Sequence, residues 1–380
     1  MNEPIVHIAI PAMNEYNYIF NTIKSISKNS NFKLYILINQ PEKYWNDNRI
    51  DICLNNQKTY EEIRKKFPWV IVLDKFSKGK GWEKGGVGEA RSYLFDYILK
   101  NCSKNDIIAS LDADTTVEEN YCSEIIKGLK NSKISAISIP YYHRLTKDTI
   151  LNKKLLYYEI YMRTYSINLS RIGSIYNFTA LGSAIAVKPE KYKKVGGYLK
   201  REAGEDYYLL QSLVKNFKIS NYINTIVYPS TRESKRVPFG TGPAISFSFE
   251  KLIENYPIFN PKLFDDIKEF YNNVHSFLDG KSSNRFSTFI LSNRKNVTAI
   301  SKIRENFKNE PLFKRGVERY IDGVKILQFL KYFNNNSLEN LNNLYKLLNI
   351  DFELKSVENE SQLEKARKIL TKIDLRLKKI

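Results

Sequence analysis

Cysteine and histidine, the residues that build disulfide frameworks and zinc sites, are scarce in this sequence. Its 380 residues include three of each, and no two cysteines form a Cys-x-x-Cys pair. A small, odd number of widely spaced cysteines excludes a disulfide scaffold and a cysteine-based metal centre. We therefore expect the protein to work in a reducing compartment.

Long apolar runs are also missing. No run reaches the roughly 18–20 residues that a membrane-spanning helix needs, and the longest weakly polar stretch, residues 178–187, is interrupted by Gly182 and Ser183. The first strand-like segment begins at residue 5, which leaves no room for a signal peptide. These absences predict a cytoplasmic protein without a transmembrane segment.

Acidic residues are too few to balance the basic ones. The 41 aspartates and glutamates face 60 lysines and arginines, so the formal net charge is +19. Such a surface attracts nucleic acid, anionic lipid headgroups or phosphorylated substrates. It is equally what a basic proteome rich in lysine and asparagine produces. The charge is therefore compatible with a phosphorylated or lipid-linked ligand and with peripheral membrane contact, but it identifies neither.

Short apolar segments of strand length alternate with segments of helical spacing in the first two-thirds of the chain. Predicted strands lie at residues 5–10, 33–38, 69–73, 107–111, 134–140 and 223–228, and predicted helices at 19–26, 59–67, 90–99, 116–129 and 151–167. We take residue 11, a proline, to end the first strand. This alternation predicts an α/β fold with a mostly parallel sheet flanked by helices.

The alternation stops near residue 250. The helical segments that follow lie near residues 262–277, 299–307, 316–333, 338–348 and 361–380, with few strand signals and no repeat of constant period. We therefore predict two domains, an α/β domain over residues 1–250 and a mainly helical region over residues 251–380.

Two aspartates follow the buried strand at residues 107–111. Asp112 and Asp114 stand at i and i+2, so their side chains can lean the same way where the strand ends. Two neighbouring carboxylates repel one another, and oxygen ligands of this kind favour Mg²⁺ or Mn²⁺. The alternative is an ordinary turn, because aspartate is common at turns and helix N-caps.

Other polar segments end neighbouring strands. Residues 11–15, Asn39 and the loop after residue 73 fall at the same predicted sheet edge as the two aspartates. In open parallel sheets the ligand crevice lies beyond the carboxyl ends of the strands. The convergence favours a ligand site over a simple turn.

Two further motifs lie beside predicted helix starts. Residues 78–91 form a basic, glycine-dense loop before a helix, where backbone amides favour an anion, although flexible glycine loops are common. Glu205 and Asp206 follow Gly204 in the first turn of another helix. Their alternative role is to complement the helix dipole.

Together these pieces resemble a family 2 glycosyltransferase with the GT-A fold, over residues 5 to about 243. The resemblance is carried by five ordered pieces: residues 10–15, 85–91, 111–114, 179–183 and 204–206. It implies a nucleotide diphosphate sugar as donor and Mg²⁺ or Mn²⁺ on the diphosphate. The C-terminal third of the chain carries no resemblance.

The resemblance also implies residue roles on the donor side. Pro11, Asn14 and Glu15 line the nucleotide pocket. Gly86 and Arg91 lie by the ribose and diphosphate.

The acids receive separate roles. Asp112 reaches the ribose or a metal-bound water, and Asp114 binds the metal. Asp206, with Glu205 beside it, is the base that deprotonates the acceptor hydroxyl. Arg236, in a basic loop after residue 231, adds positive charge to the leaving diphosphate.

Two departures concern the nucleobase and the metal. Many relatives have acids at the end of the second strand, where this chain has Asn39 and Gln40, so the base preference stays open. Some relatives supply a histidine as a further metal ligand, but residues 232–242 contain none, which leaves Glu233 or water.

The predicted function is transfer of a sugar, with inversion, to the hydroxyl of an unidentified acceptor that carries phosphate or a lipid. The alternatives are a nucleotidyltransferase, which lacks an activating lysine motif here, and a non-catalytic protein that binds nucleotides or nucleic acid. Salt-dependent binding to generic DNA without a response to nucleotide sugars would favour the last.

Overall fold

The computed structural model describes residues 3–234, 240–333 and 336–379, and they form two compact units. Apart from the chain end, the first unit takes its residues from Met1–Leu145 and Thr179–Pro243, and the second from Thr146–Phe178 and Ala244–Lys378. The predicted domains at 1–250 and 251–380 stay a prediction, because the second unit also draws on residues 146–178 from the middle of the chain.

The first unit is built on a seven-stranded sheet. Its order is β3-β2-β1-β4-β7-β6-β8. The strands are β1 (Val6–Ala12), β2 (Phe32–Asn39), β3 (Ile71–Lys75), β4 (Ile107–Ser110), β6 (Ile134–Ser138), β7 (Ile185–Val187) and β8 (Lys218–Ser220). All neighbouring pairs are parallel except those of β7, which runs antiparallel to β4 and β6. The predicted fold class, a mostly parallel sheet flanked by helices with a mainly helical C-terminal region, is confirmed.

The central strands are apolar because helices cover both faces of the sheet. Every residue of β4 is buried, as are all residues of β1 except Pro11. The prediction that Pro11 ends the first strand is wrong, because Pro11 pairs with Leu37 and Ala12 with Ile38. β1 tolerates a proline there because its pairing with β4 has already ended at Ala9, so a missing N–H disrupts no ladder on that side.

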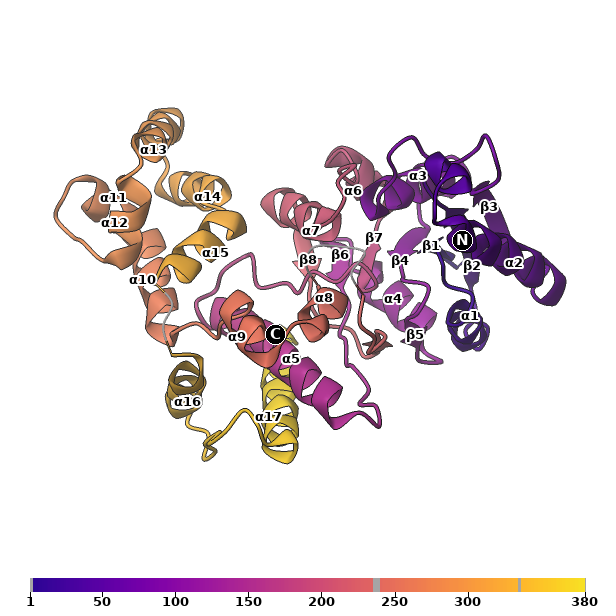
Figure 1. Ribbon diagram of the computed structural model, residues 1–380. Helices are drawn as coiled ribbons and strands as arrows, with labels where there is room; N and C mark the ends of the chain where they lie inside the picture. Colours follow the sequence, from indigo (N-terminus) through magenta and orange to yellow (C-terminus); the bar gives the residue numbers. More distant parts are fainter. Residues whose placement is uncertain (1–2, 235–239, 334–335, 380) are drawn as a thin grey trace. The chain divides into compact units, whose positions relative to one another are not determined.

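Helices connect and cover these strands. They are α1 (Ile19–Ile26), η1 (Glu42–Asn46), α2 (Ile50–Lys66), α3 (Val87–Leu99), α4 (Tyr121–Lys130), α6 (Pro189–Lys194) and α7 (Glu205–Asn216). In Figure 1, α3, α6 and α7 lie above the strands, and α1 and α4 lie below them. The buried residues of α1 recur at i, i+3, i+4 and i+7, from Ile19 to Ile26, which is why its bounds follow directly from the apolar spacing.

Two predicted helices have different bounds in the structure. α2 begins at Ile50 rather than at residue 59, because its inward face includes the polar residues Asn56 and Thr59, which hide the apolar period. The helix predicted at residues 116–129 begins only at Tyr121. Before it, β5 (Thr116–Val117) pairs with β9 (Val227–Tyr228), a tertiary contact that overrides the local helical spacing.

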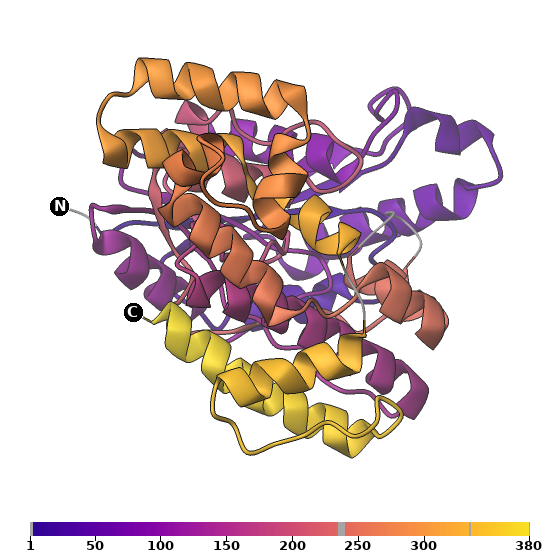
Figure 2. The same ribbon diagram turned by 90° about the vertical axis from the view of Figure 1, so that its left-hand side faces the viewer.

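The second unit is helical. Its elements are α5 (Thr149–Arg171), α9 (Phe249–Asn255), α10 (Pro261–Asn272), α11 (Val274–Leu278), α12 (Arg285–Leu291), α13 (Arg294–Asn306), α14 (Glu310–Tyr320), α15 (Gly323–Tyr332), α16 (Ser337–Leu347) and α17 (Glu360–Lys378), while α8 (Thr241–Ser246) spans the boundary between the units. α17 lies alongside α5 (Figure 1, Figure 2). Among the described residues, no helix is both long and apolar enough to cross a lipid bilayer.

Buried charges join α5 to α17. Arg163 of α5 binds Glu159 at 2.5 Å and Asp374 at 3.3 Å, and Arg367 binds Glu159 at 3.3 Å. All four side chains are at most 2% exposed. Because removal of one partner would leave a buried charge uncompensated, this network ties the two helices together.

Candidate active site

The Asp112–Asp114 segment is held where β4 ends. The Leu111 N–H donates to the Ala9 carbonyl at 3.0 Å, so the chain follows β1 one residue beyond the ladder. The Thr115 N–H then donates to the Asp112 carbonyl at 3.2 Å, and the Thr22 hydroxyl donates to the Ala113 carbonyl at 2.9 Å. The turn considered from the sequence is therefore present, and it serves to fix both carboxylates at the edge of the sheet.

Arg91 binds one acid of this pair and one from α7. Its Nη2 donates to Asp112 at 2.5 Å and its Nη1 donates to Glu205. Arg91 is 4% exposed and Glu205 is 2% exposed, whereas the Asp112 side chain is 38% exposed. Gly182 lies against the guanidinium, and a Cβ at that position would overlap it. The loop at residues 179–183 therefore needs a glycine to let Arg91 reach both carboxylates.

Burial changes the ionisation of this cluster. Burial raises the pKa of Glu205 and of Asp206, and the Arg91 charge opposes that rise. The Tyr207 N–H donates to Asp206 at 2.7 Å, which orients that carboxylate at the start of α7. A half-buried carboxylate with a raised pKa is a stronger proton acceptor than one in water, as a general base requires.

A second arginine gathers the remaining acids. The Arg232 Nε donates to Asp114 Oδ2 at 2.7 Å, and its Nη2 donates to the two carboxylate oxygens of Glu15 at 2.6 and 2.8 Å. Its guanidinium carbon lies 4.3 Å from the centre of the Tyr18 ring. Burial raises the pKa of Asp114 to about 6, with the charges of Glu15 and Asp112 adding to the rise and Arg232 opposing it.

The two clusters are neighbours at one sheet edge. The negative charge of Asp112 raises the pKa of Asp114 on one side and of Asp206 on the other. Glu15 joins this edge because β1 and β4 are adjacent parallel strands that both end here. The structure therefore brings together six of the residues selected from the sequence: Glu15, Arg91, Asp112, Asp114, Glu205 and Asp206.

The other predicted site residues are placed less directly. Asn14 follows β1 with φ of 60°, and its N–H donates to the Asn56 side chain at 2.8 Å. Gly86 precedes α3, and a Cβ there would lie 3.4 Å from the Arg201 carbonyl oxygen, so its close approach is to the chain itself. Arg236 lies outside the described residues. The roles assigned to these residues and to Pro11 stay predictions.

The polar side chains at the end of β2, Asn39 and Gln40, are buried and form hydrogen bonds within the protein. The Asn39 side chain donates to the Ala12 carbonyl at 3.0 Å and accepts from the Trp82 indole at 3.1 Å. The Gln40 side chain accepts from Asn56 at 2.8 Å. These contacts join β1, β2, α2 and the glycine loop. The preference for one nucleobase stays open.

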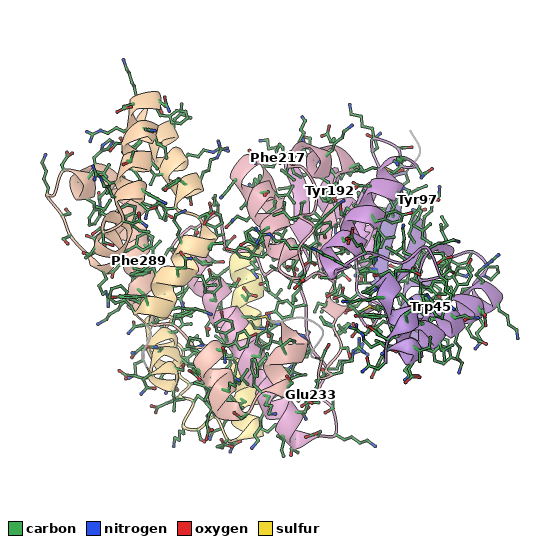
Figure 3. The ribbon with its side chains drawn as sticks, turned by 45° about the horizontal axis from the view of Figure 1, so that its top comes forward. Trp45, Tyr97, Tyr192, Phe217, Glu233 and Phe289 are labelled. Atoms are coloured by element: carbon green, nitrogen blue, oxygen red, sulfur yellow. The ribbon has the colours of Figure 1, made fainter. Side chains whose placement is uncertain are left out.

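The described residues do not fit a divalent cation in this arrangement. Each acid of the Asp112–Asp114 pair binds a guanidinium, and the part of the chain that the structure describes contains no group of three or more histidines, cysteines, aspartates or glutamates placed to hold a metal ion. Glu233, the further ligand considered from the sequence, is exposed (Figure 3). The Mg²⁺ or Mn²⁺ site at Asp112 and Asp114 therefore stays a prediction.

Three residues of this edge were not selected from the sequence. Tyr18 and Arg201 belong to no motif, whereas Arg232 is the first residue of the basic, glycine-bearing loop from which only Arg236 was selected as a site residue. Arg201 accepts a hydrogen bond on its carbonyl from the Gly88 N–H at 3.2 Å, which covers part of the α3 N-terminus. The predicted anion site at that N-terminus is thus partly filled by the chain.

Asp74 organises the start of the glycine loop and gives a testable pH dependence. Although burial raises its pKa, hydrogen bonds from the Ser77 and Phe76 N–H groups, the Ser77 hydroxyl and Lys80 outweigh it and lower the pKa to about 2. A lowered folded-state pKa stabilises the protein above the unfolded value of 3.8, and that stability is lost as the pH falls toward 2.

We expect Asp74→Asn to lower the free energy of unfolding by about 2 kcal/mol at pH 7 and hardly at all near pH 2. Urea unfolding of both proteins between pH 2 and pH 7 measures the difference. An equal loss at both ends of the range would show that Asp74 acts through packing rather than through its charge.

Comparisons with known proteins find likenesses among solved structures but not among family models or curated proteins. No family model matches the sequence, and a search of the curated proteins finds no match. Among solved structures, TarS of S. aureus in complex with UDP-GlcNAc is 13% identical with a TM-score of 0.40, over 92% of this chain and 93% of that one. The mannosyltransferase PcManGT of Pyrobaculum calidifontis, in complex with GDP-Man and Mn²⁺, is 10% identical with a TM-score of 0.42, over 99% of this chain and 88% of that one.

Proposed function

We propose that this protein transfers a sugar from a nucleotide diphosphate donor to an acceptor hydroxyl. The observation that carries the proposal is the juxtaposition at one sheet edge of two arginine–carboxylate clusters linked through Asp112. Such a transfer needs positive charge where the diphosphate leaves and a carboxylate where the acceptor loses its proton. The two clusters offer these two functions side by side.

The donor side of the proposal rests on Glu15, Asp114 and Arg232. The guanidinium of Arg232 is a strong phosphate-binding group, since its donors match phosphate oxygens in geometry. It lies at the carboxyl ends of the strands, where open α/β sheets bind their ligands. Arg236, as the sequence predicts, would add to this charge.

The acceptor side rests on Asp206. Its carboxylate lies in the first turn of α7, and its raised pKa suits proton removal from a hydroxyl as that oxygen attacks the sugar. Glu205 is bound by Arg91, so we assign the role of base to Asp206. In this proposal the sugar lies between the two clusters, so the acceptor hydroxyl attacks from across the sugar, displacement is in line and the anomeric configuration inverts.

The finer parts of the proposal are a family 2 transferase of GT-A type, a cytoplasmic location and an acceptor that carries phosphate or a lipid. The order of the motifs and the excess of basic residues support them. Mg²⁺ or Mn²⁺, when bound, would neutralise diphosphate charge. That part depends on Asp114, which Arg232 holds in this arrangement.

The proposal is tested by thermal unfolding with a panel of nucleotides. UDP, GDP and their sugars, with and without Mn²⁺, should raise the melting temperature, since a ligand at a hundred times its Kd stabilises by about 2.7 kcal/mol. Nucleoside monophosphates and a generic DNA duplex serve as controls. If the duplex alone raises the melting temperature, in a salt-dependent way, the chain is a nucleic-acid-binding protein instead.

A further inference from the structure

Arg232 occupies the position that a cation would take between Glu15 and Asp114. Three of its hydrogen bonds to these carboxylates measure 2.6 to 2.8 Å, and they join residues 217 and 118 positions apart in the sequence. Its side chain is 21% exposed, that of Asp114 17% and that of Glu15 5%. The arrangement is therefore a partly buried, charge-assisted clamp rather than a surface ion pair.

The Arg232 guanidinium compensates the negative charge of these two carboxylates, as a bound metal ion would. Two carboxylates held together repel one another, and a positive charge between them removes the repulsion. The guanidinium also lies over the face of Tyr18, which favours a cation at this place. A divalent ion that binds Asp114 through Oδ2 competes with Arg232 Nε for that oxygen and is repelled by the guanidinium charge beside it.

We propose that Arg232 is the resident cation of this site, and that a divalent cation binds Asp114 in competition with it. The exchange replaces one guanidinium by one metal ion at the same carboxylate, so cation binding carries the free-energy cost of breaking the clamp. The proposal rests on the proposed site but not on sugar transfer, because it concerns cation binding alone.

Removal of the Arg232 charge should therefore strengthen metal binding. In Arg232→Gln, Mn²⁺ no longer has to break the charge-assisted hydrogen bonds between Arg232 and the two carboxylates. We therefore expect Mn²⁺ to bind this variant about tenfold more tightly than wild type, or better. Electron paramagnetic resonance titration of the full chain with Mn²⁺ measures free and bound ion directly, without nucleotide and without activity. Circular dichroism melts of each variant establish that it is folded.

Arg144 provides a matched control. It is an exposed arginine of the same unit whose guanidinium carbon lies 4.2 Å from the centre of the Tyr228 ring, much as Arg232 lies over Tyr18. Arg144→Gln lowers the net charge by the same amount, so it reports any general effect of charge on Mn²⁺ binding. We expect its Mn²⁺ affinity to equal that of wild type.

Two further variants test whether the gain in Mn²⁺ affinity depends on Asp114 and on loss of the Arg232 charge. Asp114→Asn combined with Arg232→Gln should lose the gain in affinity, whereas Arg232→Lys, which keeps the charge, should bind Mn²⁺ no more tightly than wild type.

The proposal is overturned if Arg232→Gln binds Mn²⁺ no more tightly than wild type, whether both bind or neither does. It is equally overturned if the gain survives in the double variant. A failure of nucleotide sugars to bind would contradict the proposed function and leave this result unaffected.

Discussion

Asp206→Asn is expected to lower turnover by about 10²–10⁴-fold while nucleotide-sugar binding stays nearly unchanged. Asparagine has the shape of aspartate and can still accept the hydrogen bond from the Tyr207 N–H, but it cannot take a proton. A group that acts only in the transition state changes kcat and leaves ground-state binding intact. Single-turnover kinetics and donor titration on the same protein samples separate the two quantities.

Asp96→Asn is the control for that variant, because Asp96 is an exposed acid of α3 away from the sheet edge. Equal losses of turnover and donor affinity in Asp206→Asn would show that Asp206 positions the donor instead. The pH profile gives a second readout. Because burial raises the pKa of Asp206, the acidic limb of kcat/KM should lie above the ordinary aspartate value of 3.8.

Arg91→Met is expected to cost about 3–5 kcal/mol of the free energy of unfolding. The change leaves Glu205, which is 2% exposed, without the guanidinium that compensates its charge. Arg91→Met combined with Glu205→Gln removes both charges, so we expect it to recover most of the loss. Asp112 stays solvated in both variants because its side chain is 38% exposed. Urea unfolding of wild type, both single variants and the double variant completes the cycle.

A surface pair gives the comparison for this cycle. Arg49 and Asp47, whose side chains are 40% and 29% exposed, form a more solvated ion pair in the same unit, and Arg49→Met should change the free energy of unfolding far less than Arg91→Met. If the double variant of Arg91 and Glu205 is no more stable than Arg91→Met, the loss comes from packing around Gly182 rather than from an uncompensated charge.

The secondary structure of the first unit could be predicted from sequence where a helix has one apolar face or where a strand is a short, continuous apolar run. α1 has its predicted bounds because its buried positions recur with the helix period, and α3 differs from its prediction by a few residues. β2 and β4 also lie within a few residues of their predicted bounds, because strands buried on both faces are apolar at nearly every position. α2 was predicted too short because its buried face contains Asn56 and Thr59. β5 and β9 were not predicted at their bounds because two-residue strands have no period and are made by their partner.

The residues of the candidate site also divide into those that the sequence places and those whose partners depend on the tertiary structure. The sequence by itself determined that Glu15, Asp112 and Asp114 follow strands and end at one sheet edge, because parallel strand topology places such segments together. Only the tertiary structure determined which arginine pairs with each carboxylate. Arg232 lies 217 residues from Glu15 and Arg91 lies 114 residues from Glu205. Periodicity records which face of an element is buried, but the partner across such a separation depends on how the whole chain packs.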